Sequence, residues 1–221
     1  MAKNAKKAKK AKKVKKVKTA ARRARRAAPA VTRLAAPAVI LPAFDGPGPD
    51  ALVPIPPTNT FNQGLRSASE QTMLRVFGVP GQKTRDCSPA TGSFKSRIVS
   101  RVDVGPFKVS GLDIAVASLK LVFADASQQI PEVVAAVKTA GMLCVRHKRT
   151  NPNSFSNHSW GSAIDIFFGS GVVPQGSHKT HRGCLQLVPF FNHHGWFWGA
   201  GFSGSSVDSM HFEVSEGTIQ P

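Results

Sequence analysis

The chain has 221 residues, and its 30 basic residues against 12 acidic ones give a formal net charge of +18. This length accommodates one domain with a sizeable core and flanking segments. The charge points to polyanionic partners such as nucleic acid, anionic lipid or bacterial envelope polymers, without choosing among them. The sequence has no Gly-x-x-x-x-Gly-Lys-Ser/Thr loop, no Ser-x-x-Lys pair and no Cys-x-x-Cys pair. Nucleotide hydrolysis, serine–lysine catalysis, dithiol redox chemistry and a zinc ribbon therefore have no support.

Residues 1–33 form a polybasic tail with ten lysines, five arginines and no acidic residue. Such a segment repels itself and cannot bury a core, so we predict that it is disordered. We expect residues 3–26 to bind polyanionic envelope polymers or nucleic acid. The lack of interleaved aromatic residues weakens the case for base stacking.

Residues 34–65 are rich in proline and are predicted to form a semi-rigid linker. The apolar stretch at residues 35–44 is short and interrupted by prolines. It is therefore too short to span a bilayer and does not resemble a secretory signal. We expect a protein that is made in the cytoplasm and has no transmembrane segment.

Residues 66–221 are predicted to form one domain. Apolar residues at helical spacing and a proline suited to a first turn predict three helices, over residues 112–123, 131–141 and 185–194. Short apolar runs predict strands over residues 142–146, 163–168, 196–198 and 210–214. Helices and strands segregate, which predicts an α+β domain in which helices flank a small antiparallel sheet.

Two blocks near the C-terminus carry residue types that bind metals. His158 and Asp165 lie seven residues apart, and Asp208 precedes His211 by three residues. Two imidazoles and one carboxylate make a three-ligand zinc site whose fourth position is open for water. Asp208 is then the candidate general base. We expect Asp165 and His211 on neighbouring strands of the sheet, and His158 in the preceding loop.

The blocks at residues 156–165 and 208–213 resemble the D-alanyl-D-alanine carboxypeptidase family of zinc peptidases. Relatives of this family include the L-alanyl-D-glutamate endopeptidases of phage endolysins, and the wider group shares a fold with the Hedgehog signalling domain. The likeness also includes residues 140–146 and 194–200, and reaches from about Val76 to Ser215. It implies a Hedgehog/DD-peptidase-like fold and one zinc ion per chain.

The resemblance implies that His158, Asp165 and His211 bind the zinc ion while Asp208 acts as base. It also implies an arginine upstream of the first ligand that steadies the developing charge on the substrate carbonyl. We assign this role to Arg146.

Arg149 is the alternative, although its odd spacing puts it on the opposite face of a strand from Arg146. Ser156 is expected to donate or accept a hydrogen bond in the substrate cleft, and its alternative is a loop-capping role. Trp198 is expected to line a substrate groove, and its alternative is packing in the core.

Two features stay open. Glu213 shares a strand face with His211, which allows it to orient that ligand or to be an ordinary solvated or salt-bridged glutamate. The three cysteines leave at least one thiol unpaired. Cys144 lies in an apolar pattern typical of a buried residue, whereas a Cys87–Cys144 bridge is the alternative; Cys184 has no assigned partner.

Together these features predict a zinc metallopeptidase that hydrolyses peptidoglycan stem peptides. It would be a D-Ala-D-Ala carboxypeptidase or an L-Ala-D-Glu endopeptidase of the endolysin kind. The alternatives are a non-catalytic zinc-binding domain of the Hedgehog type and a nucleic-acid or polyanion-binding protein that acts through its basic tail. We expect a monomer that acts at the bacterial cell wall, after holin-type release.

Overall fold

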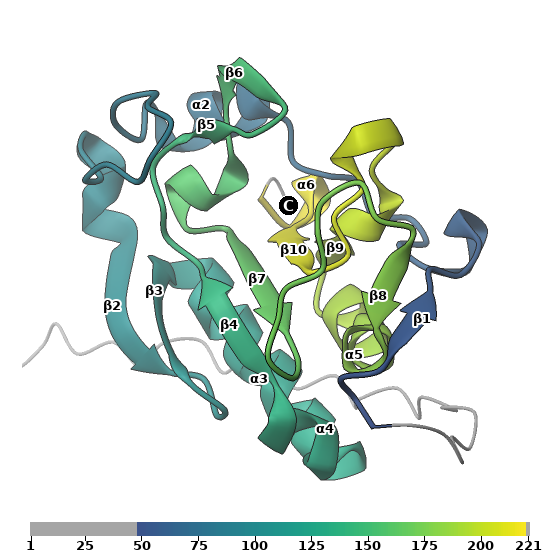
Figure 1. Ribbon diagram of the computed structural model, residues 1–221. Helices are drawn as coiled ribbons and strands as arrows, with labels where there is room; N and C mark the ends of the chain where they lie inside the picture. Colours follow the sequence, from purple (N-terminus) through teal and green to yellow (C-terminus); the bar gives the residue numbers. More distant parts are fainter. Residues whose placement is uncertain (1–47, 220–221) are drawn as a thin grey trace, which may run out of the picture. The chain divides into compact units, whose positions relative to one another are not determined.

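The computed structural model describes residues 48–219, so the predicted tail at residues 1–33 and the first part of the predicted linker lie outside the described residues. The described part forms an α+β domain of short helices and strands, as predicted (Figure 1). The elements are, in chain order, β1 (Leu52–Pro54), η1 (Thr58–Thr60), α2 (Glu70–Phe77), η2 (Ser93–Arg97), β2 (Ile98–Asp103), β3 (Lys108–Leu112), α3 (Asp113–Gln129), α4 (Pro131–Ala136), β4 (Lys138–Gly141), β5 (His147–Lys148), β6 (Asn151–Phe155), η3 (Asn157–Trp160), β7 (Ala163–Phe167), β8 (Lys179–His181), α5 (Arg182–His193), β9 (Trp196–Trp198), η4 (Gly199–Gly201), η5 (Gly204–Ser206), β10 (His211–Val214) and α6 (Glu216–Ile219).

A four-stranded sheet lies at the centre of the fold, with its strands in the order β4, β7, β10, β9. All neighbouring pairs in this sheet are antiparallel. The predicted strands at residues 163–168, 196–198 and 210–214 are confirmed as β7, β9 and β10. Three two-stranded pairs join β1 to β8, β2 to β3 and β5 to β6.

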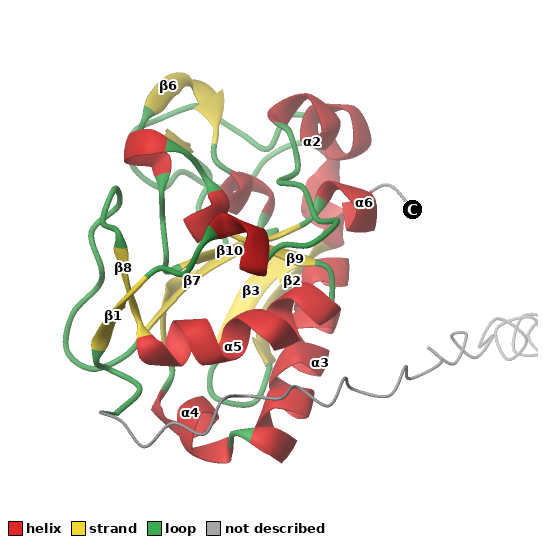
Figure 2. Cartoon of the chain, turned by 90° about the vertical axis from the view of Figure 1, so that its right-hand side faces the viewer, coloured by secondary structure: helices red, strands yellow, loops and turns green. Residues whose placement is uncertain are grey.

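Helices α3 and α5 lie on one side of the four-stranded sheet (Figure 2). Phe212 of β10 stacks on Phe191 of α5 with ring centroids 4.1 Å apart. Phe191 in turn meets the edge of Phe123 of α3 at 6.0 Å. All three rings are buried, so the main apolar core lies between the sheet and these two helices.

Helices α3 and α5 are both longer than predicted. Helix α3 continues beyond residue 123 to Gln129, because its buried face continues at three- and four-residue spacing through Ala115, Leu119, Val122 and Ala126. Helix α5 begins at Arg182 and ends at His193. Gly195 then adopts a φ of 77°, a conformation that glycine tolerates and that turns the chain into β9.

Two predicted elements differ in the structure. The second predicted helix ends at Ala136 instead of residue 141, because Lys138–Gly141 forms strand β4 and pairs with β7. The predicted strand at residues 142–146 is not a regular strand, although backbone groups of this segment form hydrogen bonds on both sides. Their neighbours are a 3-10 helix and a loop, and neither offers the continuous ladder that a strand requires.

Residues 48–65, which the predicted boundary assigns to the linker, pack on the domain. Strand β1 pairs with β8, and buried Phe61 meets the edge of Trp198 with ring centroids 4.7 Å apart. Asn62 occupies the free edge of β9, where its side-chain amide accepts from the Trp198 N–H at 2.8 Å and donates to the Trp198 carbonyl at 2.9 Å. The folded unit therefore begins before residue 66.

Cys87 and Cys144 form a disulfide, which resolves the open question of their pairing. Cys184 is a free, buried thiol, and burial raises its pKa so that it stays protonated. Between residues 48 and 219, no helix combines the length and the apolar character needed to cross a membrane.

Candidate metal centre

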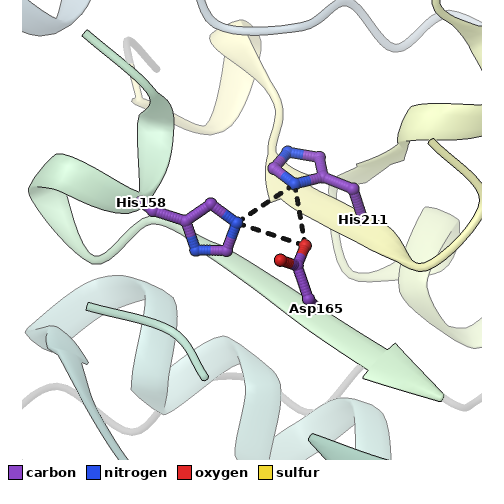
Figure 3. Close-up of side chains that lie close together, drawn as sticks. All are labelled: His158, Asp165 and His211. Carbon is purple, nitrogen blue, oxygen red and sulfur yellow. Dashed lines mark hydrogen bonds and ion pairs between the residues drawn. The ribbon is translucent and has the colours of Figure 1, made fainter. Parts of the chain in front are cut away.

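Three side chains converge from three elements: His158 from η3, Asp165 from β7 and His211 from β10 (Figure 3). Asp165 and His211 are direct partners in the β7–β10 ladder, so their side chains lie on the same face of the sheet. This confirms the expected placement on neighbouring strands. Gly161 ends η3 with a φ of 63°, and a Cβ atom there would lie 2.6 Å from the Gly111 backbone. Glycine at this position therefore allows the chain to return from η3 to β7.

The closest donor atoms of the three residues form an almost equilateral triangle. His158 Nε2 lies 3.2 Å from both Asp165 Oδ1 and His211 Nδ1, and His211 Nδ1 lies 3.1 Å from Asp165 Oδ1. Tetrahedral ligands about 2.0–2.1 Å from zinc are separated from one another by about 3.3 Å. Both the kinds of donor atom and their spacing fit a zinc ion held by three protein ligands.

Each histidine is oriented through the ring nitrogen that faces away from the triangle. His158 Nδ1 donates to the Met142 carbonyl at 2.8 Å, and His211 Nε2 donates to Glu213 Oε2 at 2.9 Å. These oxygens only accept, so the N–H group of each ring faces them. The lone pairs of His158 Nε2 and His211 Nδ1 are thereby directed to the metal position.

Glu213 is fully enclosed and contacts a candidate ligand directly. Its side chain accepts hydrogen bonds from Asn157 Nδ2 at 2.9 Å and from Ser67 Oγ, in addition to His211. Burial opposes its charge, but these hydrogen bonds and the neighbouring imidazole outweigh burial and hold the pKa of Glu213 below its usual value. The solvated alternative for Glu213 is therefore wrong, whereas its ion pair with His211 agrees with both the orienting role and the salt-bridged alternative.

The electrostatics of the triangle favour a bound cation. Burial opposes the charge of Asp165, yet His158 and His211 outweigh it and hold the pKa of Asp165 well below its usual range. Burial also disfavours a charged His211, but hydrogen bonds to Asp165 and Glu213 prevail and raise the pKa of His211 to about 10. A metal-binding imidazole must be neutral, so zinc binding would displace a proton from this cluster.

Asp208 lies in the turn that leads into β10. Its backbone N–H donates to the Gly199 carbonyl at 3.0 Å, and its own carbonyl accepts from the His211 N–H at 3.3 Å. Among the described residues, its Oδ1 is a buried oxygen with no hydrogen-bond partner. Burial raises the pKa of Asp208, although His211 opposes this shift. A half-buried carboxylate with increased proton affinity beside the triangle suits a general base, and that role remains a prediction.

The Arg146 guanidinium interacts electrostatically with the carboxylates of Asp165 and Asp208. Burial lowers the pKa of Arg146 and Arg149 lowers it further, while the two carboxylates oppose these effects. Its Nη1 donates to the His147 carbonyl at 3.0 Å. Arg149 is exposed at the turn between β5 and β6. The structure thus brings Arg146 to the site, and its role on a substrate carbonyl stays a prediction.

Ser156 and Trp198 occupy different environments. Ser156 is buried directly before η3, and its backbone N–H donates to the Arg146 carbonyl at 3.1 Å. Trp198 has no exposed surface; its Nε1 donates to the Ser209 carbonyl at 2.8 Å, and it is the partner of Phe212 on the helix-covered face. This geometry matches the packing interpretation of Trp198 and gives no support to a substrate contact.

Two other aromatic residues lie on the ligand side of the sheet and were missed from the sequence. Phe202 is partly exposed, and its ring centroid is 5.7 Å from that of His211 and 5.4 Å from that of Phe197. Phe197 is the ladder partner of Glu213 and so shares the ligand face. It also borders an open hollow lined by Thr58, Asn59, Phe61, Asn62, Gln63, Gly64, Leu65 and Gly201. The sequence of β9 shows that successive side chains point to opposite faces of the sheet, but it does not show which face carries the metal ligands.

The α+β domain presents Asp165 and His211 on a small antiparallel sheet and His158 on the adjoining η3, beside the half-buried Asp208, and this donor set is typical of a catalytic zinc site with an open fourth position. Residues 149–214 match the family described as D-alanyl-D-alanine carboxypeptidase, which confirms the resemblance drawn from the motifs. The matched segment contains His158, Asp165, Asp208 and His211. A search of curated proteins and a search of solved structures each gave no match. The match and the candidate metal site together support a metallopeptidase of the zinc class.

Proposed function

We propose that this protein is a zinc-dependent hydrolase of peptidoglycan stem peptides. The observation that carries the proposal is the triangle of donor atoms with sides of 3.1 and 3.2 Å, beside the half-buried Asp208 with its buried Oδ1. A purely structural zinc site is closed by four protein ligands and needs no free carboxylate. The family match supports the same class of substrate.

When bound, a zinc ion supplies a Lewis acid for the scissile carbonyl and lowers the pKa of water at the site. Asp208 accepts a proton from the attacking water and passes it to the leaving amine. Arg146, which lies within electrostatic range of Asp165 and Asp208, stabilises the negative charge that develops on the carbonyl oxygen. His158 and His211 keep their orientation through Met142 and Glu213.

The direct test is mass spectrometry of the fragments released from purified peptidoglycan by the zinc-loaded protein, with a chelator-treated sample alongside. Metal-dependent loss of the terminal alanine would identify a D-Ala-D-Ala carboxypeptidase. Stem peptides freed at L-alanine would identify an L-Ala-D-Glu endopeptidase. Absence of new fragments, with zinc bound, would contradict the proposal and favour a non-catalytic domain of the Hedgehog type.

We also propose that residues 3–26 hold the enzyme at polyanionic polymers of the bacterial envelope, after the protein leaves the cytoplasm by holin-type release. The support is the sequence itself, in which the first 33 residues carry fifteen basic residues and no acidic one. Deletion of residues 2–26 should weaken binding to cells at low salt but leave hydrolysis of soluble stem peptides unchanged. Unchanged cell binding after the deletion would contradict this role, and strongly salt-dependent binding of DNA by the full-length chain alone would favour nucleic acid as the target.

A further inference from the structure

Residues 142–147 run between η3, which carries a candidate zinc ligand, and the loop at residues 78–92. On the η3 side, the segment holds His158 from two directions. The Met142 carbonyl accepts from His158 Nδ1 at 2.8 Å, and the Cys144 N–H donates to the His158 carbonyl at 3.0 Å. The position of this segment therefore determines both the orientation of the His158 ring and the position of the His158 backbone.

The same segment includes Arg146, whose backbone is held in place by hydrogen bonds to η3. The Arg146 N–H donates to Ser159 Oγ at 3.1 Å, and the Arg146 carbonyl accepts from the same hydroxyl at 2.8 Å. That carbonyl also accepts from the Ser156 N–H at 3.1 Å. A shift of the segment would thus move His158 and Arg146 together.

The opposite edge of the segment bonds to the loop at residues 78–92. The Ser88 N–H donates to the Val145 carbonyl at 2.8 Å, and the His147 N–H donates to the Thr84 carbonyl at 2.9 Å. Residues 144 and 146 face η3 while residues 145 and 147 face the loop, which is the alternation of an extended chain. The loop therefore acts as the outer support of the segment.

The Cys87–Cys144 disulfide is the covalent tie between this loop and the segment. Residues 78–92 contain no helix, and their only strand-like pairing is an isolated bridge at Ser88. Cys87 is exposed to solvent. The disulfide is thus accessible to a reductant, and it adds a covalent tie to a loop that is otherwise held by non-covalent contacts, such as the hydrogen bonds of Lys83 to Glu70 and of Trp160 to the Gly78 carbonyl.

We propose that the Cys87–Cys144 disulfide positions His158 and Arg146, so that its reduction weakens zinc binding and slows turnover. The step takes two electrons and two protons from a thiol reductant, breaks the S–S bond, and yields two cysteine thiols and the disulfide of the reductant. The site would then be weakened in a reducing cytoplasm and complete in oxidising surroundings. The effect on turnover rests on the proposed function, whereas the effect on zinc affinity does not.

The test compares the full-length protein with the Cys87→Ser/Cys144→Ser double variant. Zinc affinity is measured by competition with a chromophoric chelator, and amide hydrogen exchange is measured on both metal-free proteins. We expect the double variant to bind zinc about 10- to 100-fold more weakly, the range for loss of groups that orient a ligand. The amides of residues 144 and 146 should exchange at least tenfold faster. Cys184→Ala is the matched control, because it removes the free thiol, keeps the disulfide and should change zinc affinity by less than twofold.

Zinc affinity within twofold of wild type in a folded double variant would overturn the proposal. If circular dichroism shows that the double variant is unfolded, the comparison is made on the wild-type protein before and after reduction with a phosphine. In that comparison, unchanged amide hydrogen exchange at residues 144 and 146 after reduction would overturn the proposal. Failure of the oxidised protein to cleave peptidoglycan would count against the proposed function and leave the affinity comparison valid.

Discussion

Each of the two candidate histidine ligands presents a different ring nitrogen to the metal position. His211 presents Nδ1 because Glu213, two residues along the same strand face, occupies its Nε2. His158 presents Nε2 because the Met142 carbonyl occupies its Nδ1. The shape of the triangle therefore depends on one carboxylate and one backbone carbonyl that are not ligands themselves.

The Glu213→Gln substitution tests the contribution of that carboxylate. Glutamine keeps the shape and can still accept from His211, but it removes the negative charge. We expect zinc affinity to fall about 10- to 100-fold, as is typical when a partner of a metal-bound histidine is changed. Chelator competition measures the loss. Glu132→Gln, at an exposed position of α4, makes the same chemical change away from the site and should leave zinc affinity unchanged.

Asp208 is expected to be required for hydrolysis but not for zinc binding. In Asp208→Ala the three candidate ligands remain, so the protein should keep its zinc while hydrolysis falls by about 10²- to 10⁴-fold, the range for loss of a general acid–base group. Zinc content by mass spectrometry and peptide release are measured on the same preparation. His158→Ala should lose both zinc and activity. Near-normal hydrolysis by Asp208→Ala would show that another residue is the base.

The raised pKa of Asp208 also predicts that, without metal, the wild-type protein and the Asp208→Asn variant differ in stability by an amount that depends on pH. Burial makes the folded state hold this proton more tightly than the unfolded state, so ionisation destabilises the fold. Asp208→Asn removes the ionisable group and should increase the free energy of unfolding near pH 7. The gain should shrink as the pH falls through the raised pKa and vanish below about 4, the ordinary value for aspartate. Denaturant unfolding at several pH values checks this, with the exposed Asp86→Asn as control.

At the scale of elements, strand register decides which residues the site contains. The pairing of β7 with β10 makes Asp165 and His211 neighbours, whereas the pairing of β9 with β10 puts Trp198 on the helix-covered face. Phe197 then lies on the ligand face. A shift of register by one residue would exchange these two aromatics, because side chains alternate along a strand.

The turn η4 is packed tightly against the site at Gly199. A Cβ atom at this position would lie 2.6 Å from the Asp208 carbonyl oxygen and 3.0 Å from His211 Cβ. Gly199→Ala should therefore displace the segment that carries both residues, lower the free energy of unfolding by about 1–3 kcal/mol and reduce turnover. Thermal unfolding and peptide release measure these effects. Gly217→Ala, where a new Cβ meets nothing within 4 Å, is the matched control; an equal effect of both changes would contradict the packing explanation.

At the scale of the whole molecule, the domain includes more of the chain than its composition indicates. Residues 48–65 are rich in proline, yet they supply β1, the buried Phe61 and the amide that covers the edge of β9. Proline is compatible with such edge positions, so a proline-rich composition does not separate a linker from an edge strand.

A pair of truncations tests this boundary. A chain that begins at residue 48 should unfold at the same denaturant concentration as the full-length protein. A chain that begins at residue 66 loses buried Phe61 and the hydrogen bonds of Asn62. It should be less stable by about 3 kcal/mol or more, the cost of deleting one buried phenylalanine side chain. Equal stability of the two truncated chains would place the domain boundary near residue 66.

The sequence by itself determined the kinds of metal-binding residue, their spacing, and the two strands that carry Asp165 and His211. These features are local: short apolar runs mark strands, and ligand types at close spacing mark a metal site. Only the tertiary structure decided that Glu213 is enclosed against His211, that Cys87 pairs with Cys144, that residues 142–146 lie between η3 and a loop, and that Phe197 and not Trp198 lies on the ligand face. Each of these depends on contacts between segments far apart in the chain, and the pattern of a single segment does not specify which partner it meets.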